Sequence, residues 1–221
     1  MKLTGSQIVI ATSGPGATNL VTGIATAYMD SVPMVAITCN VGRALLGKDS
    51  FQEINITGVT TQITKQNFIV MDVGELAATI RRAFAIARTG RPGPVLIDIP
   101  KDITAAESDF EAMKVDNEAI LAKGDNKSRR IIKISEPAES DLEAAANMIN
   151  NATRPIIYAG GGVKISGAEK ELLELAEKAG IPVSQSLMAR DCFPADNPLC
   201  TWMLGMHGTK ASNMAVTPIV I

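Results

Sequence analysis

The sequence is poor in aromatic residues and contains a single histidine. Phe, Trp and Tyr make up 4% of its 221 residues, too few for the base-stacking surface of a protein that binds single-stranded nucleic acid. The three cysteines, Cys39, Cys192 and Cys200, are scattered, and their spacing matches no common zinc motif. We therefore expect three free thiols, buried or half-buried.

The chain also lacks an excess of charge of one sign and any long apolar run. Its formal net charge is -2 and its pI is near 5.5, which gives no electrostatic basis for binding nucleic acid or a membrane surface. No apolar run approaches the roughly 20 residues that span a bilayer, and residues 1–6 lack the apolar stretch of a signal peptide. With 46% hydrophobic and 20% charged residues, the composition predicts a cytoplasmic α/β protein.

Short β-rich runs alternate with helical stretches along most of the chain. Strands are predicted at 7–11, 34–39, 68–71, 95–99, 155–159 and 182–186. Helices are predicted at 17–29, 75–88, 140–150 and 168–179. The Gly-rich segments 13–19 and 160–162 are expected to form loops at the carboxyl ends of strands in two separate α/β units. This order predicts parallel sheets covered by helices on both faces, in three layers.

The character of the sequence changes after the first of these units. Residues 104–130 carry Glu, Asp, Lys and Asn without sustained periodicity, as an interdomain linker does. The sequence thus predicts a first domain at 1–103, a linker at 104–130 and a second domain at 131–221. The first strand begins almost at the start of the chain, and 218–221 resemble the beginning of another strand. We therefore expect an internal piece of a longer protein.

Two motifs suggest nucleotide binding but lack an essential residue. Gly14–Asn19 follows a predicted strand, as a dinucleotide fingerprint does, but Asn19 replaces the third glycine and the next strand ends without an acidic residue. Gly42–Asp49 has the spacing of a phosphate-binding loop, but Asp49 replaces the Ser or Thr that binds magnesium. A solvated loop explains the second motif better. Gly160–Gly162 fits a ligand at a sheet edge or only a tight turn.

Taken together, several segments resemble a known family. Segments 10–19, 30–33, 49–53, 63–65 and 90–102 are similar, in order, to the pyrimidine-binding domain of acetolactate synthase large subunits, which are thiamine-diphosphate enzymes. Segments 158–162 and 204–209 are similar to the central, flavin-binding domain of the same family. The Phe51-Gln52-Glu53 and Leu204-to-Gly208 elements together favour the flavin-containing synthase among these enzymes.

The resemblance implies a function, cofactors and partners. The reaction would condense two 2-keto acids with loss of CO2, in branched-chain amino acid biosynthesis. The cofactors would be thiamine diphosphate, FAD and Mg²⁺, the last bound in a further domain outside this chain. A homodimer or tetramer is implied, with a small regulatory subunit as a further partner. Because the family's catalytic glutamate would also lie outside the chain, we expect the fragment alone to be inactive. Two alternatives stay open: a non-catalytic Rossmann-like nucleotide-binding or assembly module, and another thiamine-diphosphate carboligase or oxidase.

Carried over by position, the resemblance implies site residues. The predicted catalytic and substrate-channel residues are Gln52, Phe51, Lys101 and Lys65. The predicted cofactor-binding residues are Gly14, Pro15, Gly16 and Asn19, and, for the flavin, Ser31, Arg91, Gly160, Gly161, Gly162, Ser186, Leu187, Leu204, Gly205, Met206 and His207. No metal ligand is predicted within the chain. Cys39–Gly42, Ser50 and Gln66 depart from the family's usual residues, which affects expectations of substrate and inhibitor preference rather than of the reaction.

Overall fold

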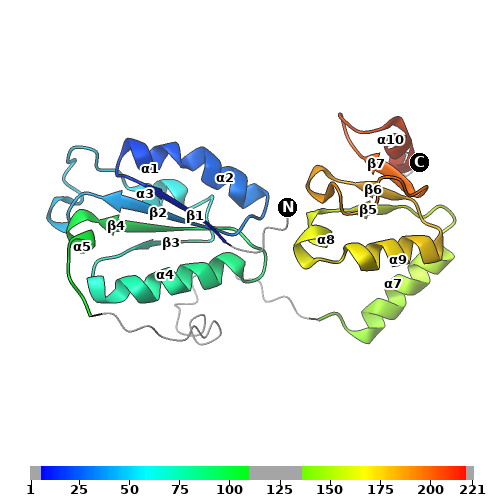
Figure 1. Cartoon of the computed structure of the whole chain (residues 1–221), viewed down its shortest axis with the longest axis horizontal. Helices are drawn as coiled ribbons and strands as arrows, with labels where there is room; N and C mark the ends of the chain where they lie inside the picture. The colour runs from blue at the N-terminus through cyan, green and yellow to red at the C-terminus, as the bar shows by residue number, and fades with distance from the viewer. Residues whose placement is uncertain (1–5, 110–135, 218–221) are drawn as a thin grey trace. The chain divides into compact units, whose positions relative to one another are not determined.

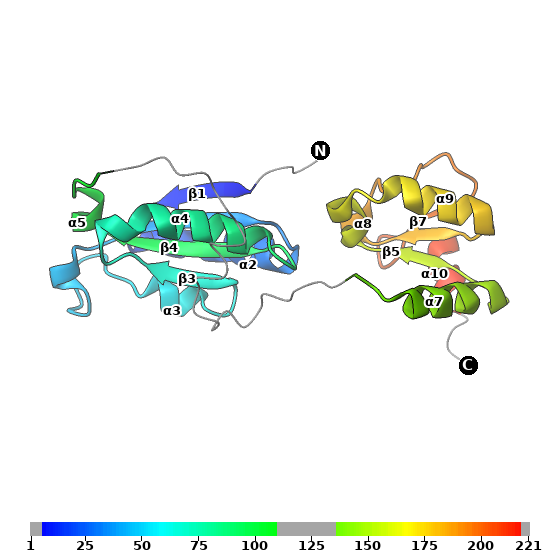
Figure 2. The ribbon, with the colours of Figure 1, turned by 90° about the horizontal axis from the view of Figure 1, so that it is seen from below.

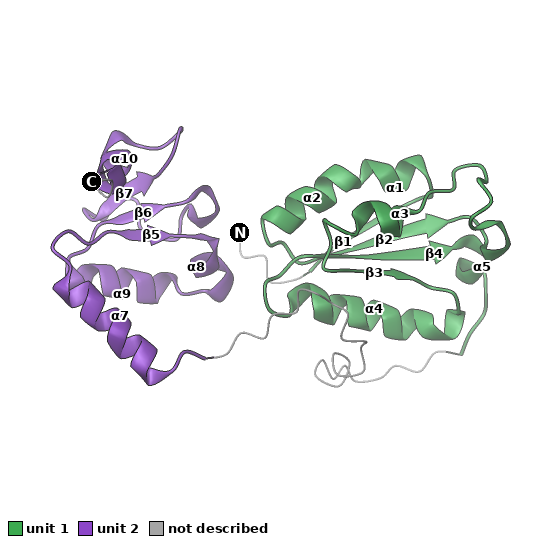
Figure 3. Ribbon diagram, turned by 180° about the vertical axis from the view of Figure 1, so that it is seen from behind, with its two compact units in different colours: residues 1–135 green, residues 136–221 purple. Residues whose placement is uncertain are grey.

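A computed structural model describes residues 6–109 and 136–217. The chain divides into two compact units, residues 1–135 and 136–221 (Figure 3). Most of the predicted linker, and the strand expected at 218–221, lie outside the described residues. The predicted domain boundaries therefore stay a prediction, and each unit is described by itself.

Unit 1 is a parallel sheet between two layers of helices (Figure 1). Its strands, in the order β1-β2-β4-β3, are β1 (Gln7–Ala11), β2 (Met34–Asn40), β4 (Pro94–Pro100) and β3 (Gln66–Ile69), and every pair is parallel. One face carries α1 (Pro15–Asn19), α2 (Val21–Met29) and α3 (Ile56–Thr60). The opposite face carries α4 (Val73–Arg88), which runs along β4 (Figure 2). Two short elements follow strands: η1 (Arg43–Leu45) and α5 (Lys101–Thr104).

The central strand β4 explains why this sheet has two cores. All seven residues of β4 are buried, as expected for a strand covered on both faces. Ile97 belongs to the cluster that packs against α4, and Leu96 to the cluster that packs against α1, α2 and α3. On the neighbouring strand, Val35 and Ala36 divide between the same two clusters. The strand period of two thus sends alternate residues to opposite helical layers.

Unit 2 is a smaller parallel sheet in the order β5-β6-β7. Its elements are α7 (Glu139–Asn151), β5 (Ile157–Ala159), α8 (Gly161–Ser166), α9 (Glu169–Ala179), β6 (Val183–Gln185), η2 (Leu187–Ala189), β7 (Cys200–Met203) and α10 (Lys210–Val216). Leu172 and Ala176 of α9 pack with Val183, Cys192 and Phe193 in its core.

The parallel α/β class is confirmed, but several local predictions were wrong. The predicted helix at 17–29 is two helices separated by Leu20, and the first begins earlier, at Pro15, because proline is preset for the first helical position. The loop prediction therefore fails for 15–19. It fails also for Gly161 and Gly162, which form the first turn of α8, although both segments do follow strands in separate units. The strand β3 begins two residues earlier than predicted, and α3, β7 and α10 were not predicted.

Two expectations from composition can be checked directly. The cysteines are free; Cys192 is buried, and Cys39 and Cys200 are half-buried, as predicted. Among residues 6–109 and 136–217, no helix has the length and apolarity to cross a membrane.

Candidate functional site

The carboxyl edge of the unit 1 sheet brings together predicted residues from distant parts of the sequence. Gly14 follows β1 with φ +56°, and a Cβ atom built on it would lie 2.8 Å from the carbonyl oxygen of Gln52 and 3.0 Å from its Cα. Only glycine permits this backbone-to-backbone approach. The glycine turn and the Gln52 loop are therefore in direct contact, at the edge where ligands of open α/β sheets bind.

The loop that carries Phe51 and Gln52 has an unusual backbone. Gln52 has φ +60°, in the left-handed region, although it is not glycine. Such residues cluster at functional sites and cost about 1–3 kcal/mol each. Phe51 is 87% exposed, and Gln52 is also exposed, so a ring and an amide are both available to a ligand.

At the same edge, Arg43 links the ends of three strands through an ion pair and a hydrogen bond. The Nε of Arg43, after β2, donates to Oδ2 of Asp102 at 2.6 Å, and the backbone N–H of Arg43 donates to Oδ1 at 2.9 Å. Its Nη1 donates to the carbonyl of Met71, after β3, at 2.8 Å. The Arg43 guanidinium lowers the pKa of Asp102. The predicted residue Lys101 is the exposed neighbour of Asp102 in α5. The site prediction omitted Arg43 and Asp102 because nothing in the sequence pairs them.

Beneath this edge lies a buried polar network. Asp98, in the middle of β4, accepts from the hydroxyl of Thr38 at 2.7 Å and from Nδ2 of Asn40 at 2.6 Å. Burial raises the pKa of Asp98, and these two hydrogen bonds oppose the rise. The same Asn40 amide donates to the carbonyl of Ile54 at 3.2 Å. The network therefore fastens the end of the Gln52 loop to the central strands.

Other predicted residues of unit 1 lie at the opposite, amino edge of its sheet. Arg91 precedes β4, and its Nε donates to the hydroxyl of Ser31 at 2.7 Å while Nη2 donates to the carbonyl of Met29 at 3.0 Å. The structure thus brings together Ser31 and Arg91, which were both predicted to contact the flavin. Ser31 has φ +60°, and Arg91 is exposed.

Lys65 does not join the Gln52 cluster. It precedes β3, and its Nζ donates to the carbonyls of Ile86 and Thr89, the latter at 2.5 Å, at the end of α4. The side chain is 8% exposed, and burial lowers its pKa to about 8. The structure therefore places Lys65 as a cap of a helix C-terminus, where a cation is favourable, and its predicted role in a substrate channel stays a prediction.

In unit 2 the predicted flavin residues follow all three strands at the carboxyl edge. Gly160 follows β5, Ser186 and Leu187 follow β6, and Leu204 follows β7. Gly161 lies against η2, since a Cβ atom built on it would be 3.0 Å from Cβ of Met188. A Cβ at Gly160 or Gly162 would meet nothing within 4 Å, so these positions leave the edge open to a ligand.

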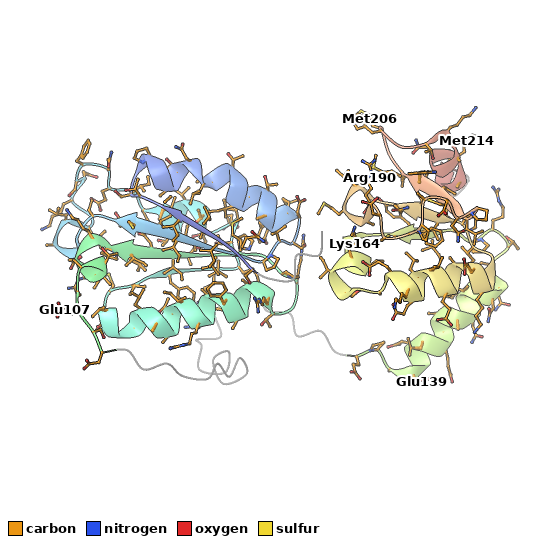
Figure 4. All side chains as sticks on the ribbon, in the orientation of Figure 1. Glu107, Glu139, Lys164, Arg190, Met206 and Met214 are labelled. Carbon is orange, nitrogen blue, oxygen red and sulfur yellow. The ribbon has the colours of Figure 1, made fainter. Side chains whose placement is uncertain are left out.

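The loop that contains Leu204 to His207 is held in place by Asn213 and Gly208, two residues that were not predicted as site residues. Asn213 of α10 accepts from Gly205 N–H at 2.9 Å and donates to its carbonyl at 3.0 Å. Gly208 is required at the base, because a Cβ there would lie 2.2 Å from the Met203 carbonyl oxygen. Met206 extends from this loop away from the strands (Figure 4) and is 92% exposed.

His207 is exposed and lines a pocket of about 250 Å³ beside this loop. Arg190, Trp202 and Gln185 line it too. Within the described part of the chain, Oε1 of the buried Gln185 has no hydrogen-bond partner. Because that atom is fully covered, a ligand in the pocket could reach it only after the side chain moved. Trp202 has φ +69° at the irregular pairing between β6 and β7.

Neither unit offers a metal centre among residues 6–109 and 136–217, where no group of three or more His, Cys, Asp or Glu side chains could hold an ion.

Comparison with known families identifies the class. The family described as "Thiamine pyrophosphate enzyme, N-terminal TPP binding domain" matches residues 1–59, and "Thiamine pyrophosphate enzyme, central domain" matches residues 142–218. These matches cover more than half of the chain, which therefore belongs to the thiamine pyrophosphate enzymes and carries parts of two of their domains.

Within that class, the chain is similar to acetolactate synthase large subunits. It is 51% identical over 210 residues to the probable acetolactate synthase large subunit of Methanocaldococcus jannaschii, covering 95% of this chain and 34% of that protein. It is 48% identical over 206 residues to the acetolactate synthase large subunit of Corynebacterium glutamicum, covering 93% of this chain and 31% of that protein. For acetolactate synthase 1, chloroplastic, of Zea mays the figures are 45%, 95% and 31%. The chain thus spans about a third of the length of these relatives.

Proposed function

We propose that the chain is part of an acetolactate synthase, which joins two 2-keto acids with loss of CO2. The observation that carries the proposal is the contact between Gly14 and the strained Gln52 loop at the carboxyl edge of a sheet. The similarity to acetolactate synthase large subunits, which extends over 95% of the chain, supports the same proposal.

The residues at this edge fit thiamine diphosphate. When bound, this cofactor supplies an electron sink for the carbon that loses CO2. The exposed ring of Phe51 would form an apolar wall beside it, and the Gln52 amide could donate and accept hydrogen bonds without adding charge. Lys101, exposed at the same edge, would attract the carboxylate of the keto acid.

Each unit, taken by itself, has residues that we propose contact FAD. Arg91 presents a planar guanidinium suited to a diphosphate, and Ser31 fixes one side of it at 2.7 Å. In unit 2, the open glycine positions at 160 and 162 would let a ligand approach the backbone. We further propose that Mg²⁺ binds outside this chain, and that the whole protein is a cytoplasmic homodimer or tetramer with a small regulatory subunit.

The test is to restore the full-length protein and measure acetolactate from pyruvate. Gln52→Gly keeps the left-handed backbone and removes the amide, and should lower kcat by about 10-fold or more, since a lost hydrogen bond of about 1.4 kcal/mol is tenfold. Gln52→Glu should lower it further, because its charge repels the substrate carboxylate. The matched control is Gln62→Ala, which alters an exposed glutamine of the same unit. Wild-type turnover in both Gln52 variants would remove Gln52 from the site.

The main alternative is another carboligase or oxidase among the thiamine pyrophosphate enzymes, because the two matching domain families do not specify the reaction. Product analysis with pyruvate and 2-ketobutyrate distinguishes it, because only a synthase yields acetolactate or acetohydroxybutyrate.

A further inference from the structure

The carboxylate of Glu53 turns back onto the loop that precedes it. Its Oε1 accepts a hydrogen bond from the N–H of Gly47, and its Oε2 accepts from Lys48 at 3.3 Å and from Ser50 at 3.0 Å. The N–H of Gly47 contributes most to lowering the pKa of Glu53, so the group is ionised at neutral pH. One anion thus occupies the centre of an arc of backbone donors.

The same loop contains backbone conformations that need support. Asp49 has φ +54° and Gln52 has φ +60°, and neither is glycine. In a free chain such residues relax toward negative φ, because the left-handed region costs about 1–2 kcal/mol per residue. The far end of the loop is fixed by the hydrogen bond from Asn40 to Ile54. The near end is held by the three N–H groups that donate to Glu53 and by the Ser50 hydroxyl, which donates to the carbonyl of Leu45 at 3.1 Å.

We propose that Glu53 is a positioning residue: by holding the amides of 47–50, its carboxylate sets the placement of Phe51 and Gln52. Phe51 is 87% exposed, so its position derives from the loop backbone rather than from packing. Glu53 itself makes its contacts to the loop and does not take part in the reaction. This inference rests on the proposed function, which gives Phe51 and Gln52 their roles at the cofactor.

A matched pair of variants separates the hydrogen bonds from the charge. Glu53→Gln keeps the length of the side chain but replaces one acceptor oxygen with an NH2 group, which cannot accept. Asp49→Asn removes one negative charge from the same loop, and Asn tolerates the left-handed conformation as well as Asp does. Only the first variant should disturb the loop.

The first measurement uses the 221-residue chain and amide hydrogen exchange by NMR. In Glu53→Gln, the amides of Gly47, Lys48 and Ser50 should exchange about 10-fold faster or more, while Ile97 in β4 is unchanged. Asp49→Asn should match the wild type at all four. If Glu53→Gln does not fold, Glu53→Asp, which keeps the charge and shortens the reach, should give the same local pattern.

The second measurement uses the full-length protein and separates positioning from general stability. Glu53→Gln should lower kcat by about 10-fold, with KM changed much less, because misplaced groups chiefly affect the reacting geometry. Unchanged exchange at the loop amides would overturn the inference, and so would faster exchange with wild-type kcat. A wild-type protein that forms no acetolactate would instead refute the proposed function, and the exchange pattern would still decide whether Glu53 orders the loop.

Discussion

Replacing Lys65 with Met removes a buried ammonium group that caps α4. Two carbonyls lose their donor, those of Ile86 and Thr89, and an unpaired buried acceptor costs about 1–3 kcal/mol. The wild type meanwhile bears the cost of burying a charge. A pKa lowered from 10.5 to about 8 corresponds to about 3 kcal/mol, at 1.36 kcal/mol per unit. At pH 7 the two effects largely offset, and Lys65→Met should lower the free energy of unfolding by only about 1 kcal/mol.

The difference in the free energy of unfolding between the wild type and Lys65→Met should grow as the pH rises. Between pH 8 and 10.5 the unfolded chain keeps the Lys65 proton that the folded chain has released, so the free energy of unfolding of the wild type rises with pH. Lys65→Met lacks this gain and should fall behind by up to about 4 kcal/mol near pH 10. The two carbonyls favour the charged form, so the observed gain will lie at or below this value.

Urea denaturation followed by far-UV circular dichroism at pH 7 and pH 10 measures both values. Trp202 is the only tryptophan of the chain and belongs to unit 2, so its fluorescence identifies the transition of that unit. Lys48→Met, which alters an exposed lysine of unit 1, is the control and should show no pH-dependent difference. A difference between wild type and Lys65→Met that is the same at both pH values would refute the reasoning.

Other contacts in the structure lead to three more predictions. Gly14→Ala should lower the free energy of unfolding by at least about 2 kcal/mol, because of its positive φ and a clash with the Gln52 backbone. Gly23→Ala, in an open position of α2, should instead raise it by about 0.5–1 kcal/mol, and equal effects in urea denaturation would contradict this. Arg91→Ala should weaken FAD binding to the full-length protein by about 1.5–3 kcal/mol, measured by flavin fluorescence, and an unchanged affinity would count against the flavin assignment. Thr38→Val removes a donor to the buried Asp98 and should raise the pKa of that carboxyl further, which carboxyl-carbon NMR would detect.

The sequence was sufficient to predict a strand where burial on both faces makes its residues continuously apolar. The run Val95–Ile99 is continuously apolar and forms the buried centre of β4. It was insufficient for β7, a strand of only four residues whose Trp202 has a positive φ that no period reveals. The break at Leu20 was also missed, because apolar residues continue through it at helical spacing.

For the candidate site, the sequence suggests individual residues but not the contacts between them. The resemblance indicated both Gly14 and Gln52, but only the fold shows that their backbones touch. It indicated Ser31 and Arg91 separately, and the hydrogen bond between them is a tertiary contact. For Lys65, the resemblance implied a place in the substrate channel, and only the fold shows that its side chain is buried against helix carbonyls. The contacts of Glu53 arise because its side chain turns back onto residues 47–50, which the spacing of residues in the sequence does not predict.

The strand order of unit 1 has a consequence for synthesis. In the order β1-β2-β4-β3, the strand made last, β4, lies between β2 and β3. While the nascent chain is shorter than about residue 94, β2 has an open edge and β3 has no partner. Completion of the sheet must therefore wait until β4 has left the ribosome. Stalling translation before β4 has left the ribosome should leave an intermediate with an open sheet edge, which limited proteolysis would detect.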